Sequence, residues 1–248
     1  MATSFGALCT DFYINHKLGV KMDLPAGRET ILHLFYRIRA DHPEMSRFRR
    51  FSDELSLESR RRDGAYQWLA LRQRSIRSGS VNPETLEHGY DLHRLILKLV
   101  PYHLSVGSLD VESQELMLGF DLDAKGNHHE IVHDALIADT PLAALLETPG
   151  ARPLDVQPIF AISLSQNCDL QAWFEVKTST TPGQIRTGKF RTEPISVLLS
   201  LRRTGPIDKP DDLLANFETL REHAERLAND RLVPHLLTPI SRAITSSA

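Results

Sequence analysis

This sequence of 248 residues is short of the residue types that mark several classes of protein. Its two cysteines, Cys9 and Cys168, are too few for a disulfide framework or a zinc ribbon. No apolar run approaches the roughly 18 residues that a membrane-spanning helix needs. The opening residues, MATSFGALCT, lack the basic segment and the sustained apolar run of a secretory signal. These shortages predict a cytoplasmic protein that folds without disulfides in a reducing compartment, away from membranes.

The common catalytic and nucleotide-binding patterns are also missing. The sequence contains no GxGxxG, P-loop, GxSxG or CxxC motif. What remains is an average globular composition, with 41% apolar and 25% charged residues and a net charge of −3. A chain of this length buries a core without metal or disulfide staples. The composition leaves enzymatic activity undecided, and the missing motifs mildly favour a protein without catalytic activity.

Apolar residues recur with helical spacing in some segments and alternate in others, which predicts the α+β class, with antiparallel sheets and packed helices. Asn82 is the expected N-cap of one helix, and Asp63-Gly64 the expected turn of a hairpin. The expected helices cover residues 28–40, 83–100, 127–138 and a long C-terminal segment that Asp208 caps and Pro234 ends or kinks. The expected strands cover residues 18–24, 48–61, 65–77, 103–109, 115–122, 160–164, 170–176 and 195–201.

The clearest break in composition is the proline-rich segment 148–158. Antiparallel strands and at least one packed helix are expected on both sides of it. This pattern predicts two α+β lobes, residues 1–125 and 126–248, the second ending in the long helix. A degenerate internal duplication would produce two such lobes, which either fold separately or form one continuous domain.

Residues 129–133 read His-Glu-Ile-Val-His, the HExxH pattern of zinc-dependent hydrolases. On a helix, His129 and His133 share one face and can bind Zn²⁺, while Glu130 acts as general base on the metal-bound water. The downstream HxxGxxH extension of that pattern is absent. In the alternative interpretation Asn127 caps this helix, and His129, Glu130 and His133 lie on its solvated face.

An arginine-rich segment, residues 37–77, holds eleven arginines and six acidic residues, a net charge of +5; because the whole chain carries −3, the rest carries −8. Arginine favours bidentate contacts to phosphate or carboxylate, and aromatic residues lie among the arginines, as stacking on single-stranded nucleic acid requires. The other interpretation is a hairpin whose arginine face is solvated or covered by an acidic partner surface. The candidate residues for anion or partner binding are Arg47, Arg49, Arg50, Arg60, Arg61 and Arg62.

The segments DLQAWFEVKT, QIRTGKF and EPISVLLSLRR, followed by a helix ending in LVPHLLTPI, resemble a sporadically distributed family of uncharacterised bacterial proteins of about this length. The resemblance covers residues 155–240. It implies tandem α+β units that end in a long helix. It implies no catalytic residue, and it mildly favours a role without catalysis.

These observations give three hypotheses about function. The first is a non-catalytic binding or accessory protein without a cofactor, which acts through a protein partner or as a homo-oligomer. The second is a zinc-dependent hydrolase that uses His129, Glu130 and His133. The third is a protein that binds RNA or DNA through the arginine-rich hairpin.

Overall fold

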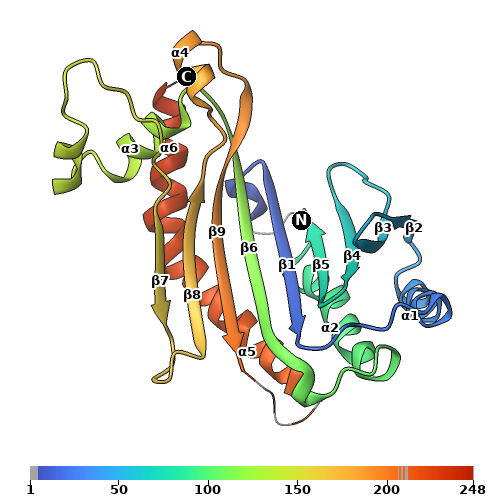
Figure 1. The fold of residues 1–248 in the computed structure, drawn as a ribbon. Coiled ribbons are helices and arrows are strands. Elements are labelled where there is room, and N and C mark those ends of the chain that lie inside the picture. Colours follow the sequence, from blue (N-terminus) through green and yellow to red (C-terminus); the bar gives the residue numbers. More distant parts are fainter. Residues whose placement is uncertain (1–4, 206, 208, 210–211, 248) are drawn as a thin grey trace.

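The computed structural model describes residues 5–205, 207, 209 and 212–247, and these are built on one antiparallel sheet of nine strands. The strand order is β2-β3-β4-β5-β1-β6-β9-β8-β7, so the first half of the chain forms one side of the sheet and the second half forms the other (Figure 1). The predicted α+β class with antiparallel strands is confirmed. The strands are β1 Asp11–Val20, β2 Met45–Arg50, β3 Glu54–Ser59, β4 Tyr66–Arg72, β5 Ser75–Val81, β6 Val111–Lys125, β7 Ile159–Ser163, β8 Leu170–Lys177 and β9 Thr192–Thr204.

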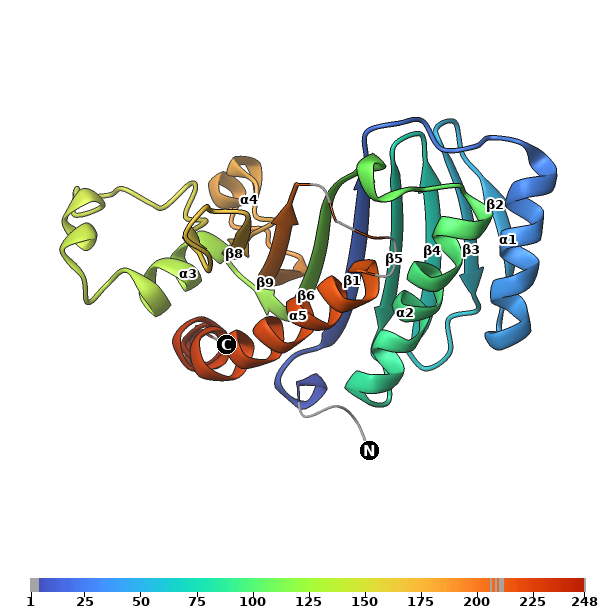
Figure 2. The same cartoon turned by 90° about the horizontal axis from the view of Figure 1, so that it is seen from below.

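Four helices, α1, α2, α5 and α6, pack on one face of the sheet (Figure 2). Figure 1 shows the other face, the open face, across whose strands no described helix packs. The α-helices are α1 Arg28–Asp41, α2 Leu86–His103, α3 His128–Leu136, α4 Pro182–Thr187, α5 Asp212–Leu227 and α6 Thr238–Ser247. The 3-10 turns are η1 Gly6–Leu8, η2 Ser108–Asp110 and η3 Pro141–Leu145, and the π-helical segment η4, Ala228–Leu237, joins α5 to α6.

Side chains alternate along each strand between the helix-covered face of the sheet and the open face. In β1 the buried side chains of Phe12, Ile14 and Leu18 point toward the helices, whereas Tyr13 and Lys17 point to the open face. The helix-facing side chains of all the central strands join the apolar stripes of the helices in a single hydrophobic core. One side of the sheet is therefore fully used for folding, and the other is available for contacts with other molecules.

The topology repeats itself across the centre of the sheet. In each half a central strand, β1 or β6, leads into a helix and outer strands, after which β5 or β9 returns beside the central strand. A helix, α2 or α5, then packs behind. The two central strands pair with each other, and the core is continuous between the halves. This repeat supports the predicted duplication at the level of topology, while the predicted lobe boundary at residue 125 stays a prediction.

Some predicted elements are wrong for local reasons. The arginine-rich segment forms the four strands β2 to β5 rather than two, because additional turns at 51–53 and 73–74 fold each run back on itself. The Asp63-Gly64 turn is confirmed, since both residues have the positive φ, 48° and 83°, that a tight hairpin turn requires. Residues 103–109 are not a strand but the last residue of α2, an irregular segment and the start of η2, and β1 covers 11–20 rather than 18–24.

Two helix ends also differ from the prediction. Thr85, not Asn82, caps α2, because its hydroxyl accepts the N–H of His88 at 3.1 Å; Asn82 instead accepts the N–H of Phe12 at 2.8 Å and ties β1 to the end of β5. Of the two effects predicted for Pro234, ending the helix is wrong, because Pro234 lies inside the π-helical segment η4, and kinking it stays a prediction. The predicted cap Asp208 lies outside the described residues.

Candidate functional site

The HExxH motif lies on α3, and Asn127 caps this helix as predicted, its side chain accepting the N–H of His129 at 3.1 Å. The expected solvated position of His129 is wrong, since this residue is only 3% exposed. Its Nε2 lies 3.1 Å from the carbonyl oxygen of Thr180, and its Nδ1 accepts the N–H of Val156 at 3.1 Å. Because the carbonyl of Thr180 only accepts and the N–H of Val156 only donates, these contacts fit the tautomer that carries its proton on Nε2. Both ring nitrogens are therefore occupied by the backbone.

The neighbouring His128 also makes hydrogen bonds at the start of α3. Its Nε2 donates to the carbonyl of Ala124 at 3.2 Å, and its Nδ1 faces Ser179. Burial lowers the pKa of His128, which favours the neutral ring. The two histidines thus act as hydrogen-bonded links between the start of α3 and the segment that follows β8.

The second histidine of the motif, His133, has different partners from His128 and His129. His133 places Nδ1 3.0 Å from Asp134, its side chain is 17% exposed, and its buried Nε2 has no hydrogen-bond partner among the described residues; Glu130 is half-buried. Over the part of the chain that the structure describes, no group of three His, Cys, Asp or Glu side chains could hold a metal ion. Binding of a metal by His129 would require loss of one of its two backbone hydrogen bonds. The zinc site stays a hypothesis without a preformed ligand set.

The six candidate arginines fall into two groups on the first-half side of the sheet. Arg47, Arg49 and Arg50 lie on the edge strand β2, and the others surround the β3–β4 turn. Arg49 contacts Glu58 at 3.2 Å, and Arg61 lies 4.0 Å from Asp11 and over the ring of Tyr66. The remaining four form no ion pair with any residue that the structure describes, and they are exposed: Arg47, Arg50, Arg60 and Arg62.

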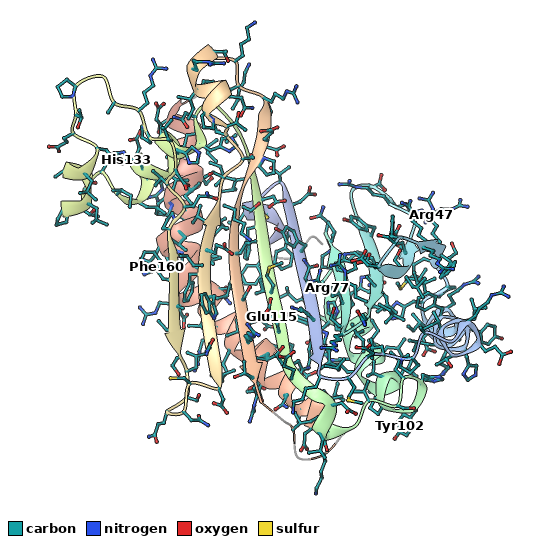
Figure 3. The ribbon with its side chains drawn as sticks, viewed as in Figure 1. Arg47, Arg77, Tyr102, Glu115, His133 and Phe160 are labelled. Atoms are coloured by element: carbon teal, nitrogen blue, oxygen red, sulfur yellow. The ribbon has the colours of Figure 1, made fainter. Side chains whose placement is uncertain are left out.

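The opposite edge strand, β7, has no such charges. Its five residues are Ile-Phe-Ala-Ile-Ser, and every one of them is exposed, Phe160 by 58%. Phe160 and Ile162 pair with Phe174 and Ala172 of β8 and so lie on the side of the sheet that carries the helices, whereas Ala161 lies on the open face. Figure 3 shows Phe160 at this edge, across the molecule from Arg47.

Further exposed apolar side chains lie in the segment that leads into β7. This segment, residues 137–158, contains η3 and otherwise has no regular structure. Its large exposed apolar residues are Leu142, Leu145 and Leu154. Sequence reasoning missed the β7 edge because alternation of Phe160 and Ile162 is typical of a half-buried strand and does not reveal that the strand has a neighbour on one side only.

Comparison with known proteins leaves the chain unassigned. No family model matches it, and no curated protein is significantly similar to it. No described helix is long and apolar enough to cross a bilayer. The edges of the sheet and its open face are therefore the features of the molecule that indicate a function.

Proposed function

We propose that this protein is a non-catalytic, cytoplasmic binding protein that associates with a second copy of itself through the β7 edge. The observation that carries the proposal is the uncharged, fully exposed β7 strand, opposite an edge that three arginines protect. In the proposed dimer, two sheets join edge to edge through antiparallel pairing of β7 with β7.

The two edges of the sheet differ in how they resist pairing. An edge strand presents unpaired N–H and C=O groups, and proteins commonly protect such edges with charges, prolines or bulges. On β2, Arg47, Arg49 and Arg50 would repel the same residues of a second copy, and the pairing with β3 is already irregular between Met45 and Arg47. β7 carries neither charge nor proline. A symmetric contact is therefore opposed at β2 and unopposed at β7.

The sequence of β7 is complementary to itself. Antiparallel pairing with a two-fold axis at Ala161 places Phe160 opposite Ile162 of the second copy, and the reverse pair forms by symmetry. Both pairs lie on the helix-covered side, where they form one apolar cluster. Aromatic and β-branched cross-strand pairs contribute about 0.2–1 kcal/mol each. A five-residue strand is small beside the roughly 1,600 Å² of a standard interface, so we expect a weak dimer whose fraction rises with concentration.

Sedimentation velocity over a series of protein concentrations tests the proposal. The wild type is expected to shift from monomer to dimer, while Ile162→Lys, which replaces one member of each apolar pair by a charge, is expected to stay monomeric. The matched control is Tyr102→Lys, which introduces the same charge at an 81% exposed residue of α2, remote from β7 in Figure 3. Circular dichroism verifies that both variants fold. A monomer at every concentration, or a dimer that Ile162→Lys leaves intact, would contradict the proposal.

A further inference from the structure

A line of side chains crosses the open face from one edge of the sheet to the other. The pairing register places one residue of each strand on this line, which is rich in basic residues. In order from β2 to β7 its members are Arg49, Ser56, Ala70, Arg77, Lys17, Glu115, Arg202, Gln171 and Ser163. Four of them are cations and one is an anion, and Figure 3 shows Arg77 and Glu115 over the middle of the sheet. We call this set the basic line.

Aromatic side chains lie on the same face, beside the basic line. Trp68, on β4, and Trp173, on β8, belong to the next register line, and Tyr13 and Tyr66 belong to the one after it. Trp173 is 38% exposed, and the other three are half-buried. With strands about 4.8 Å apart, the five steps from β4 to β8 separate the two tryptophans by roughly 24 Å. The aromatic groups therefore span the width of the open face.

Two glycines determine how the rings lie. A Cβ atom at Gly79 would be only 2.2 Å from Nε1 of Trp68, and one at Gly119 would be only 2.1 Å from Cε2 of Tyr13. The rings therefore lie over the backbone of the neighbouring strand, in space that any other residue would fill. Each ring has one side against the sheet and is partly exposed on the other, which is the arrangement on which a planar base can stack.

The acidic residues of the open face are largely engaged by neighbours. Glu58 contacts Arg49 at 3.2 Å, Glu54 contacts Arg72 at 2.7 Å, and Glu175 contacts Lys177 at 3.2 Å. Asp121 accepts hydrogen bonds from Ser196 and Tyr13. Because these carboxylates already have partners, the charge at the centre of the basic line depends on the line's own residues.

The central cations of the basic line have no such partners. Among the described residues, Lys17, Arg77 and Arg202 form no ion pair, although Glu115 lies between Lys17 and Arg202 in the register. The Nε atom of Arg77 is buried and has no hydrogen-bond partner in the part of the chain that the structure describes. The centre of the basic line thus carries three cations and one anion beside the aromatic rings.

We propose that the open face binds single-stranded nucleic acid. Phosphate groups follow the central cations, and unpaired bases stack on Tyr13, Trp68 and Trp173. Cations beside aromatic rings on a sheet surface suit a single strand, because its base faces are accessible. In a duplex the bases stack on one another and leave no face for the rings. This site differs from the arginine-rich hairpin predicted above, because its cations come from strands of both halves of the sheet.

The proposal implies a modest salt dependence. Three phosphate contacts give a slope of about −2 for the logarithm of affinity against the logarithm of salt concentration on a single strand. Affinity is then expected to fall by about 20-fold between roughly 50 mM and 200 mM salt. The chain as a whole carries −3, so contact on the open face, rather than long-range attraction, must provide the binding.

Fluorescence anisotropy of the full chain with a labelled oligouridylate of about 12 nucleotides tests the proposal. Trp173→Ala is expected to weaken binding by about 5-fold or more, because it removes one stacking surface. Arg202→Gln is expected to weaken binding and to make the salt slope less steep by about 0.7. The matched control is Arg60→Gln, the same change at the β3–β4 turn, which is expected to leave affinity within about 2-fold. Melting temperatures verify that each variant is folded.

Three outcomes would overturn the proposal. One is no binding of the oligouridylate at about 50 mM salt. Another is equal binding of a duplex RNA of the same length, which would indicate backbone contacts without base stacking. The third is a loss in Arg60→Gln that Arg202→Gln does not show, which would place the contacts at the hairpin. Ile162→Lys at β7 is expected to retain nucleic-acid binding, so the two proposals fail separately.

Discussion

At the scale of single residues, two buried histidines occupy the boundary between sheet and helices. His16 of β1 and His93 of α2 are almost fully buried, with ring centroids 5.8 Å apart. The side-chain amide of Gln114 donates to Nε2 of His16 at 3.2 Å, and Ser78 bonds His93 at 2.7 Å. Burial lowers the pKa of His16 to about 3, and burial followed by the nearby His16 lowers the pKa of His93 well below its ordinary value. Both rings are therefore neutral in the folded protein.

These histidines predict loss of stability in mild acid. Below pH 6.5 the unfolded chain takes up protons that the folded protein excludes, so the free energy of unfolding decreases as the pH falls toward 3. For one such histidine the loss between pH 7 and pH 5 is about 2 kcal/mol. Urea unfolding at both pH values is expected to show this difference between wild type and His16→Gln. The exposed His88→Gln is the control and should match the wild type. An unchanged pH dependence in His16→Gln would contradict the prediction.

His129 gives a second prediction at this scale, which separates a structural role from a zinc site. His129→Ala leaves the N–H of Val156 and the carbonyl of Thr180 without partners, so we expect a loss of about 1–3 kcal/mol in the free energy of unfolding. Glu130→Gln is expected to change stability little. Elemental mass spectrometry of tag-free protein and melting with added zinc complete the test.

The zinc-dependent hydrolase predicts a different result for the same samples. It requires about one zinc per chain, lost in the double variant His129→Ala and His133→Ala, and a melting temperature that zinc raises. Stoichiometric zinc would therefore contradict a purely structural role for His129. Protein that contains no zinc, together with a destabilised His129→Ala variant, would support the structural role.

At the scale of secondary structure, buried elements were the most predictable. The stripe Ile31, Leu34, Phe35 and Ile38 predicted α1, and all four side chains are buried. The strands β7, β8 and β9 were also predicted close to their positions. Alternation and helical spacing are local consequences of a core on one side of an element, which is why the sequence alone reveals them. Turns within polar segments leave a weaker signal, and the four strands between residues 45 and 81 were therefore predicted as two.

At the scale of the whole molecule, contacts behind the sheet join the two halves. Phe217 of α5 is fully buried, and its ring packs edge to face on His16 and Tyr90 of the first half. Arg94 of α2 makes a bidentate ion pair with Glu218 of α5, at 2.6 and 3.2 Å. Together with the β1–β6 pairing, these contacts make the stability of each half depend on the other.

We therefore expect the chain to unfold in one cooperative transition. Its two tryptophans lie in different halves, so Trp68→Phe and Trp173→Phe each leave a fluorescent reporter of one half. Each variant has its own overall stability, which circular dichroism measures during urea titration. Once this difference is subtracted, the fluorescence midpoints of the two variants are expected to coincide. Phe217→Ala should lower stability by about 3–5 kcal/mol and shift both reporters together. Separate midpoints would instead indicate that the two halves unfold independently.

The sequence by itself determined the fold class, the faces of the main helices, the Asp63-Gly64 turn and the cap of α3, because each depends on neighbours within a few residues. It did not determine that His129 is buried, because its partners Thr180 and Val156 are distant in the chain. Nor did it determine the order of the strands. Strand order alone decides that β7 is an edge and that cations from β5, β1 and β9 form one line. Both proposals therefore depend on pairings between distant segments, which only the tertiary structure provides.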